Sequence, residues 1–275
     1  MCWHTACIAQ LADLWYNEGE DQPSELCNDS PGVAPAERWP EGENPDRMIR
    51  IGVLALQGDF REHIRAMQRL GVEAHPVRLP KDLAGVDALI IPGGESTAIG
   101  KLMVAYDLVE PIRALIAAGT PVWGTCAGMI LLARETDNAL AGQPLLATMN
   151  IRVLRNAFGT QRESFETDVH IPVLGEAPYH AVFIRGPVVE SVGEGVEVLA
   201  RLAPDEAAED AASGPCTSRG HAESARDIVA VRQGNLLATA FHPEVTDDLR
   251  FHEYFLSIVR AARLTAPTVS SDRRP

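Results

Sequence analysis

One cysteine lies in a setting that suits a nucleophile. Cys126 is the centre of a Gly-Thr-Cys-Ala-Gly motif at residues 124–128, which overlaps the end of the apolar run 121–125. A sharp turn from a strand into a helix leaves no room for side chains beside the nucleophile, and this favours glycine two residues away on each side. The positive end of the helix that follows would favour the reactive thiolate. The motif also fits a buried structural cysteine, so the other motifs must decide.

A histidine and a carboxylate follow the end of another apolar run. Residues 236–240 are apolar and lead into Phe-His-Pro-Glu at residues 241–244. In an extended segment, residues two apart point to the same side. Glu244 would then hold the ring of His242 while His242 accepts the thiol proton of Cys126. Taken alone, a His-Pro-Glu sequence is more often a surface histidine at a strand end.

Tandem glycines form the third motif, Pro-Gly-Gly-Glu-Ser at residues 92–96. Glycine lets the backbone approach a ligand closely and present its N–H groups. The N–H groups of Gly94 and Ala127 would together form an oxyanion hole. The alternative is a plain turn with Ser96 as the N-cap of a helix, and the two roles are compatible. The spacing of a phosphate-binding P-loop is absent.

Strands and helices that alternate along the chain must position these motifs. Apolar runs predict strands over 49–56, 72–77, 87–92 and 121–125, and helical spacing predicts helices over 60–70, 97–105, 108–118 and 127–134. This order predicts an α/β fold whose parallel sheet is covered on both faces. Later strands near 151–155, 164–173, 180–185, 196–202, 228–233 and 235–241 predict an attached antiparallel patch, closed by a helix over 247–263.

The ends of the chain and one internal segment depart from this pattern. Residues 1–47 contain ten acidic and only two basic residues, with five prolines, and are expected to be a flexible extension or a stretch translated in error ahead of Met48. Residues 204–226, rich in alanine, glycine, serine and acidic residues, cannot bury enough apolar area to order themselves and are interpreted as an inserted loop. The domain is expected over 48–265, with 266–275 as a disordered tail.

Composition excludes several classes of protein. The 275 residues are 46% hydrophobic and 23% charged, as in ordinary globular proteins, and the net charge is −14. This acidic balance argues against nucleic acid as a partner, because binding phosphates needs clustered lysine and arginine. No stretch approaches the ~18 apolar residues of a membrane span, so no membrane partner is expected.

The cysteines indicate a reducing compartment. Of five, Cys2, Cys7 and Cys27 lie in the extension and Cys216 in the inserted loop. An odd number without regular spacing argues against a disulfide framework or a zinc site. We therefore expect a cytoplasmic protein and no metal.

The motifs together closely resemble the class I, or triad, glutamine amidotransferases, and within them the glutaminase subunits of pyridoxal 5'-phosphate synthase. The resemblance runs from about residue 48 to 262 and implies a flavodoxin-like three-layer α/β fold. It is carried by the stretches L-A-L-Q-G at 54–58, R-E-H at 61–63, P-G-G-E-S-T at 92–97, G-T-C-A-G at 124–128, R-N-A-F-G at 155–159, S-F-E at 164–166, F-I-R-G-P at 183–187 and F-H-P-E at 241–244.

The resemblance implies a role for each matching residue. Cys126 matches the nucleophile that attacks the side-chain amide of glutamine and forms a glutamyl thioester, His242 the base, and Glu244 its orienting partner. The residues that match the glutamine-binding positions are Gly94, Glu95, Ser96, Arg155, Ile184 (through its backbone) and Arg185. An arginine suits the α-carboxylate because its fork binds both oxygens.

The resemblance also implies a partner. Gln57 matches a residue beside the oxyanion hole, at the face that meets a barrel-shaped synthase subunit in a hetero-oligomeric complex. Ammonia released from L-glutamine would pass within the complex to the synthesis of pyridoxal 5'-phosphate, which is a product and not a ligand of this chain. No metal or organic cofactor is implied.

Three alternatives remain open. The chain could serve another synthase, such as imidazole glycerol phosphate synthase, or be a free-standing cysteine hydrolase like DJ-1, or a catalytically silent binding subunit. His63 is interpreted as a helix histidine that is either solvated or directed at the partner. His170 and His180 show no evident companions in the sequence.

Overall fold

A mixed sheet between two layers of helices makes up the described part of this computed structural model, which covers residues 48–138, 142–157, 164–203 and 227–265. The proposed extension 1–47, insert 204–226 and tail 266–275 lie outside the described residues. Their assignment therefore stays a prediction.

Five parallel strands form one half of the sheet, in the spatial order β2-β1-β3-β4-β12. They are β1 (Arg50–Leu54), β2 (Glu73–Val77), β3 (Ala88–Ile91), β4 (Val122–Thr125) and β12 (Leu236–Thr239). Every residue of β3, β4 and β12 is buried. Such continuous apolar strands are typical of a parallel sheet covered on both faces, as the sequence predicts.

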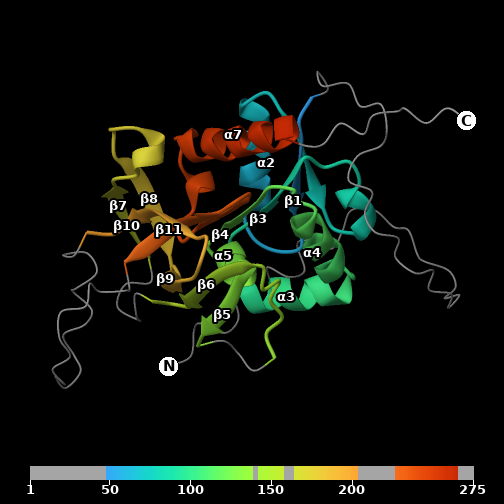
Figure 1. The fold of residues 1–275 in the computed structure, drawn as a ribbon, viewed down its shortest axis with the longest axis horizontal. Helices are drawn as coiled ribbons and strands as arrows, with labels where there is room; N and C mark the ends of the chain where they lie inside the picture. The colour runs from blue at the N-terminus through green and yellow to red at the C-terminus, as the bar shows by residue number, and fades with distance from the viewer. Residues whose placement is uncertain (1–47, 139–141, 158–163, 204–226, 266–275) are drawn as a thin grey trace, which may run out of the picture. The chain divides into compact units, whose positions relative to one another are not determined.

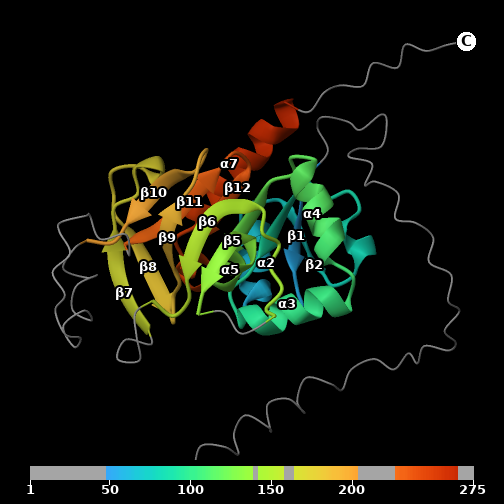
Figure 2. The ribbon, with the colours of Figure 1, turned by 60° about the horizontal axis from the view of Figure 1, so that its bottom comes forward.

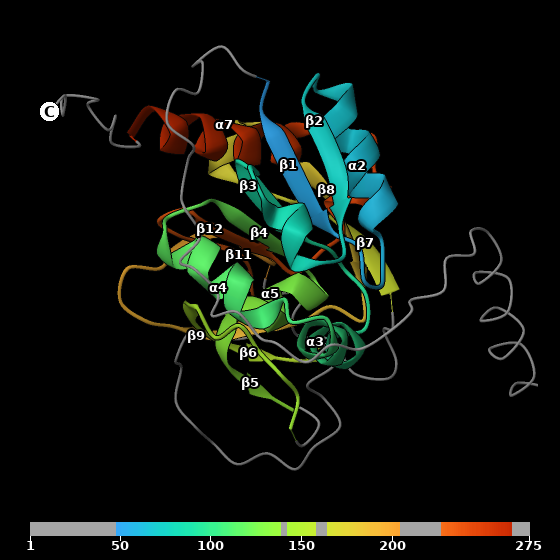
Figure 3. The same cartoon turned by 90° about the vertical axis from the view of Figure 1, so that its right-hand side faces the viewer.

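Helices cover both faces of this half (Figure 1). One face carries α2 (Phe60–Arg69) and α7 (Arg250–Thr265), while the other carries α3 (Ser96–Ala105), α4 (Val109–Ala117) and α5 (Ala127–Leu132). Figure 3 shows this three-layer arrangement from the side. Between the layers, Trp123 of β4 stacks on Phe251 of α7 with 6.1 Å between ring centroids.

The other half of the sheet is largely antiparallel (Figure 2). Beyond β12, the order continues β11-β9-β6-β5, with β10 paired to β11. These strands are β5 (Ala133–Asp137), β6 (Met149–Leu154), β9 (Val188–Val192), β10 (Glu197–Arg201) and β11 (Ile228–Gln233). A separate two-stranded sheet pairs β7 (Ser164–Val169) with β8 (Tyr179–Ile184). The predicted antiparallel patch is therefore confirmed.

The structure corrects the expected elements at several places. The strand expected over 164–173 ends at Val169, and a 3₁₀ turn (η3, Pro172–Leu174) follows it, with proline as its first residue. The helix predicted over 127–134 ends at Leu132, and β5 follows it without a break. The sequence of β5, A-R-E-T-D, is polar because it is an edge strand, where charged residues are common. Strand β9 is a further element outside the expected ones. It begins directly after the F-I-R-G-P stretch.

The topology brings the chemical motifs to one edge of the sheet. Strands β1, β3, β4 and β12 are neighbours and parallel, so their carboxyl ends meet. The Q-G-D loop at 57–59 follows β1, the tandem glycines follow β3, Cys126 follows β4, and the F-H-P-E stretch follows β12. Among the described helices, none is long and apolar enough to cross a membrane.

Candidate active site

Cys126 occupies a strained turn between β4 and α5. Its φ of 47° and ψ of −101° lie outside the usual regions for a residue with a side chain. The backbone N–H of Cys126 donates to the carbonyl of Thr239 in β12 (2.8 Å), which fixes this conformation. A Cβ on Gly124 would lie 2.5 Å from the Gly128 backbone, and one on Gly128 would collide with the carbonyl of Ile91. The steric reason for the flanking glycines is thus present.

His242 and Glu244 are both buried beside the cysteine. His242 Nδ1 lies 2.8 Å from Glu244 Oε1, while Nε2 is buried and makes no hydrogen bond of standard geometry within the described residues. Because Nδ1 faces the carboxylate, Nε2 is the nitrogen available to the thiol. The expected contact is present, but a 3₁₀ turn (η4, Pro243–Val245) forms it in place of the expected extended segment.

Burial and charge set the protonation of this pair. Burial alone would lower the pKa of His242, but the interactions with Cys126 and Glu244 outweigh it and raise the pKa to about 10. Burial alone would raise the pKa of Glu244, but His63 and His242 outweigh it and hold this pKa well below its ordinary value. His242 is therefore protonated at neutral pH.

The tandem glycines lie against both His242 and the Q-G-D loop. A Cβ on Gly93 would collide with the ring of His242, and one on Gly94 with the side-chain oxygen of Gln57. Gln57 Oε1 accepts a hydrogen bond from the Glu95 N–H (2.7 Å). Gln57 is therefore next to Gly94, as the resemblance implies. Ala127 opens α5, and first-turn N–H groups have no acceptor within their helix.

Arg155 lies beside the start of α3. Its guanidinium contacts Gln143 Oε1 (2.6 Å) and Glu95 Oε1 (3.3 Å), and its side chain is only 12% exposed. Gln143 in turn donates to Ser96 Oγ (3.1 Å). The structure thus brings Glu95, Ser96 and Arg155 together, with Gln143 as a fourth member that no motif in the sequence indicates.

The helix cap differs from the expectation. Glu95, not Ser96, is the N-cap of α3, and its carboxylate accepts from the N–H groups of Thr97 (3.0 Å) and Ala98 (2.6 Å). Ser96 is the first residue of the helix and is buried. The physical reason is that the longer glutamate side chain can bridge two of the free N–H groups at once.

The end of β8 lies over the cysteine. The Ile184 carbonyl is 3.9 Å from Cys126 Sγ, so the backbone of Ile184 is at the site as expected. The next residue, Arg185, has a φ of 47° and is exposed. With Cys126 only 6% exposed, access to the sulfur is narrow.

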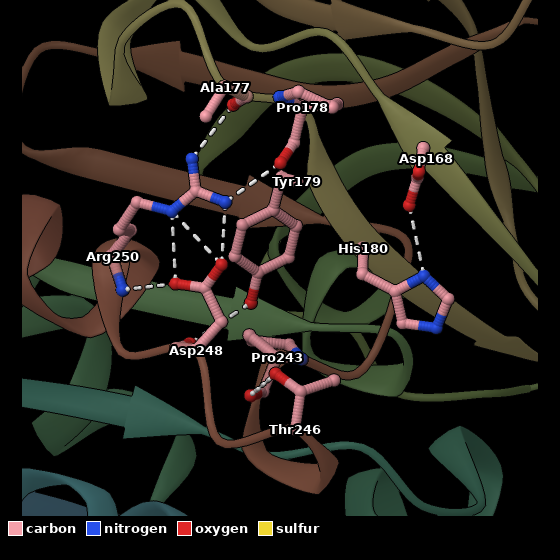
Figure 4. A network of polar contacts seen from close by, with 9 residues as sticks. All are labelled: Asp168, Ala177, Pro178, Tyr179, His180, Pro243, Thr246, Asp248 and Arg250. Carbon is pink, nitrogen blue, oxygen red and sulfur yellow. Dashed lines mark hydrogen bonds and ion pairs between the residues drawn. The ribbon is translucent and has the colours of Figure 1, made fainter.

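A polar network joins the start of α7 to the residues around the beginning of β8 (Figure 4). Arg250 binds the Asp248 carboxylate and donates to the carbonyls of Ala177 and Pro178 (both 2.8 Å), just before β8. His242 itself donates its backbone N–H to the Val182 carbonyl (2.9 Å). These contacts tie the histidine, the start of α7 and β8 into one frame.

Two histidines are placed differently from the expectation. His63 is fully buried, with Nε2 3.3 Å from Glu244 Oε2, so it is not a solvated helix residue. A signal was available, because His63 falls on the apolar face defined by Phe60 and Met67. His180 does have companions, since it lies 3.0 Å from both Glu166 and Asp168 on the two-stranded sheet.

One group of side chains in the described residues has the spacing of a metal site: Asp59, His242 and Glu244. Asp59 Oδ2 is 3.6 Å from His242 Nδ1. That nitrogen must carry a proton to donate to Glu244, and a metal would have to displace it. The donor set therefore fits a histidine–carboxylate pair better than a metal.

Comparison with known proteins agrees with this site. The SNO glutamine amidotransferase family matches residues 53–261. "Pyridoxal 5'-phosphate synthase subunit PdxT" from Herpetosiphon aurantiacus is 56% identical over 76% of this chain and 100% of its own length, and the protein of that name from Moorella thermoacetica is 53% identical over 77% and 100%.

Solved structures show the same fold. A crystal structure described as a glutamine amidotransferase aligns with a TM-score of 0.64 at 47% identity, covering 76% of this chain and 98% of that one. PurLQS from Thermotoga maritima aligns with a TM-score of 0.51 at 16% identity, over 77% and 99%, and supports the fold alone. From its sequence, its fold and the arrangement of its site, this chain belongs to the SNO family of glutamine amidotransferases.

Proposed function

We propose that this chain is the glutaminase subunit of pyridoxal 5'-phosphate synthase and hydrolyses L-glutamine to L-glutamate and ammonia. The observation that supports this most directly is that Cys126, at the end of β4, and the buried His242–Glu244 pair, after the end of β12, lie at the adjoining ends of two paired strands. The names of relatives more than 50% identical over their full length support the same activity and favour this synthase over imidazole glycerol phosphate synthase.

The reaction begins with the thiolate of Cys126. It attacks the side-chain amide carbon of glutamine, and the N–H groups of Ala127 and Gly94 stabilise the oxyanion that forms. Protonated His242 gives its Nε2 proton to the leaving nitrogen, so ammonia departs and a glutamyl thioester remains. His242, now neutral, takes a proton from water, the water attacks the thioester, and glutamate leaves. Glu244 keeps Nδ1 protonated throughout.

Arg155 and Arg185 recognise the amino-acid end of the substrate in this account. The guanidinium of Arg155 is held on one side by Glu95 and Gln143, which orients its fork. An oriented fork binds a carboxylate through both oxygens. The Ile184 carbonyl, beside the sulfur, accepts a hydrogen bond from the substrate. The carboxylate of Glu95 is available for the ammonium group, because it is half exposed.

The partner in this proposal is a synthase subunit of the barrel type, in a hetero-oligomeric complex, that receives the ammonia. The narrow access to Cys126 fits an enzyme whose hydrolysis awaits the docked acceptor. The Q-G-D loop is the natural point of control, since Gln57 binds the N–H of Glu95 next to Gly94. The cytoplasmic location expected from the cysteines stays a prediction.

The test is glutamine hydrolysis by the full chain, with and without its synthase subunit. We expect strong stimulation by the synthase subunit, and transfer of the amide nitrogen to pyridoxal 5'-phosphate when its sugar phosphate substrates are present. Hydrolysis that the synthase subunit does not stimulate would support the glutaminase activity and show that its partner is a different synthase. The absence of hydrolysis under both conditions would favour the cysteine hydrolase or the silent subunit.

A further inference from the structure

His63 is a buried imidazole that the reaction described above does not use. It lies in the first turn of α2 and is fully buried. Its Nε2 is 3.3 Å from Glu244 Oε2 and 3.2 Å from the Thr125 hydroxyl, and its Nδ1 is 3.1 Å from His252 Nε2. One ring thus contacts α7, the residue before Cys126, and the carboxylate that holds His242.

The orientation of His63 is fixed by packing. Its ring meets Trp123 edge to face, with 5.5 Å between centroids, and lies 5.3 Å from the ring of His252. The Trp123 and His252 rings also meet edge to face, at 5.0 Å. Such aromatic pairs favour defined ring orientations. A ring held on two sides in this way keeps Nε2 in hydrogen-bond contact with the Thr125 hydroxyl and within 3.3 Å of the carboxylate.

The charge on Glu244 decides where the protons lie. Its carboxylate is ionised and buried, and Oε1 already accepts from His242 Nδ1. A buried, charged oxygen left without a donor is costly, so Oε2 needs a second N–H. Within the described residues, Oε2 has no hydrogen bond of standard geometry. With its proton on Nε2, His63 is placed to supply the second N–H across 3.3 Å, and its Nδ1 is then an acceptor.

His252 completes this arrangement. Its burial and the proximity of His63 lower its pKa to about 3, so it is neutral and has a single N–H. With that proton on Nε2, His252 donates to His63 Nδ1. The hydrogen bonds then run in one direction, from His252 to His63 to Glu244, and meet the one from His242 at the same carboxylate.

We propose that His63 is a positioning residue for glutamine hydrolysis, an inference that rests on the proposed function. By donating to Glu244 Oε2 it fixes the plane of the carboxylate, and Oε1 then keeps the Nε2 of His242 directed at Cys126. Partners of this kind behind a catalytic or metal-binding group affect activity without touching the substrate. Because α2 begins directly after the Q-G-D loop, His63 also connects that loop to the triad.

Two substitutions separate this role from mere packing. The amide nitrogen of His63→Gln occupies the place of Nε2 and keeps a donor for Glu244, whereas that of His63→Asn reaches only the place of Nδ1. In the complex with the synthase subunit, we expect His63→Asn to lower kcat about 10–100-fold with KM nearly unchanged, and His63→Gln to restore most of the loss. His75→Asn is the matched control, because His75 lies on β2, the edge strand farthest from β5, where its ring contacts the Asp82 carbonyl.

The alkylation of Cys126 by iodoacetamide gives a readout independent of turnover. Its rate is followed against pH by mass spectrometry of the peptide containing Cys126, because the chain has four other cysteines. Loss of the His63 donor weakens the hold on protonated His242, so the profile of His63→Asn should move to higher pH while that of His63→Gln stays near the wild type.

Equal kcat values for the Asn and Gln variants, or an unmoved alkylation profile, would overturn the proposal. If the wild type shows no hydrolysis with its synthase subunit, the proposed function fails, while a shifted profile would still support the positioning role. If His63→Asn does not fold, His252→Asn and His252→Gln test the next hydrogen bond, the one from His252 Nε2 to His63 Nδ1. The Gln variant, which keeps the Nε2 donor, should then be the more active of the two.

Discussion

Two histidines within the described residues lie beside carboxylates, one buried and one exposed. His242 is 2.8 Å from Glu244, and His180 is 3.0 Å from both Glu166 and Asp168. The contacts are alike in chemistry and distance. However, Glu244 has no exposed side-chain area, whereas His180 and its two carboxylates are more than half exposed.

The environment therefore decides what each contact does. Water screens the charges around His180, and exposed ion pairs contribute little to stability. Around His242 the protein excludes water, and the fixed carboxylate and thiol replace it, so electrostatic interactions are stronger there. The same pair of residue types forms a weak surface contact in one region and, in the mechanism we propose, a catalytic unit in the other.

The largest expected effect comes from the nucleophile. Cys126→Ala should lower synthase-stimulated glutamine hydrolysis by about 10³-fold or more, because no thioester can form. The variant should still bind the synthase subunit, which a pull-down or sedimentation experiment measures. Retained hydrolysis in this variant would place the nucleophile elsewhere.

Breaking the buried His242–Glu244 pair is expected to reduce activity nearly as much. Glu244→Gln should lower kcat about 10²–10⁴-fold, because the amide no longer favours protonated Nδ1 of His242. Glu166→Gln makes the same change in the exposed cluster and should alter kcat less than about twofold. Steady-state kinetics give the kcat of each variant. Equal losses in Glu244→Gln and Glu166→Gln would show that burial does not distinguish the two histidines.

Substitution of Arg155, the arginine that we propose binds the substrate, should change affinity more than rate. Arg155→Ala removes a fork that binds a carboxylate and is expected to raise KM for glutamine about 10–100-fold. Arg152→Ala is the matched control, since Arg152 is paired with Asp137 on the edge strands away from the site. A reduced kcat with an unchanged KM would show that Arg155 supports the structure of the loop instead.

The pH dependence of stability follows from the raised pKa of His242. That pKa is about 10 in the folded chain against an ordinary 6.5. The contribution of the charged pair to folding is therefore complete below about pH 6.5 and is lost as the pH rises through 10. The pKa of Glu244 is lowered in the folded chain. The stability that this carboxylate contributes is therefore present above its ordinary pKa of 4.5 and is lost as the pH falls below that value.

Urea unfolding at pH 6, 8 and 10 measures this effect. The difference in free energy of unfolding between the wild type and His242→Asn should be largest at pH 6 and should shrink towards pH 10. If the difference in free energy of unfolding between the wild type and His242→Asn grew with pH, the charge assigned to His242 would be wrong.

In Cys126→Ala the pKa of His242 should fall, because the interaction with Cys126 that helps to raise it is gone, and NMR titration of the ring would show this.

The smallest effect is expected for the exposed histidine. The pKa of His180 is also raised, by its hydrogen bonds to Asp168 and Glu166, yet its exposure screens the interaction. His180→Asn should change the free energy of unfolding by less than about 1 kcal/mol and leave kcat unchanged. High salt should remove whatever remains.

Much of the site could be read from the sequence because short motifs at strand ends determine it. The glycines around Cys126 are required by close backbone contacts, and such requirements appear directly as residue types. The parallel half of the fold follows from the alternation of apolar runs with helical spacing. These features depend on local sequence.

The rest depends on contacts between distant segments. His63 and His252 are 189 residues apart, and only folding brings them together behind Glu244. The edge strand β5 has no apolar pattern because only one of its residues is buried. Gln143 has no motif around it, although it orders Arg155. Pairings of this kind leave no periodic signal in a single sequence.

The most direct test of the central claim is covalent labelling with an electrophilic analogue of glutamine. In the complex with the synthase subunit, peptide mass spectrometry should find the label on Cys126 alone, L-glutamine should protect it, and Glu244→Gln should slow the labelling while Glu166→Gln does not. Labelling of a different cysteine, or labelling of Cys126 that glutamine does not prevent, would contradict the account.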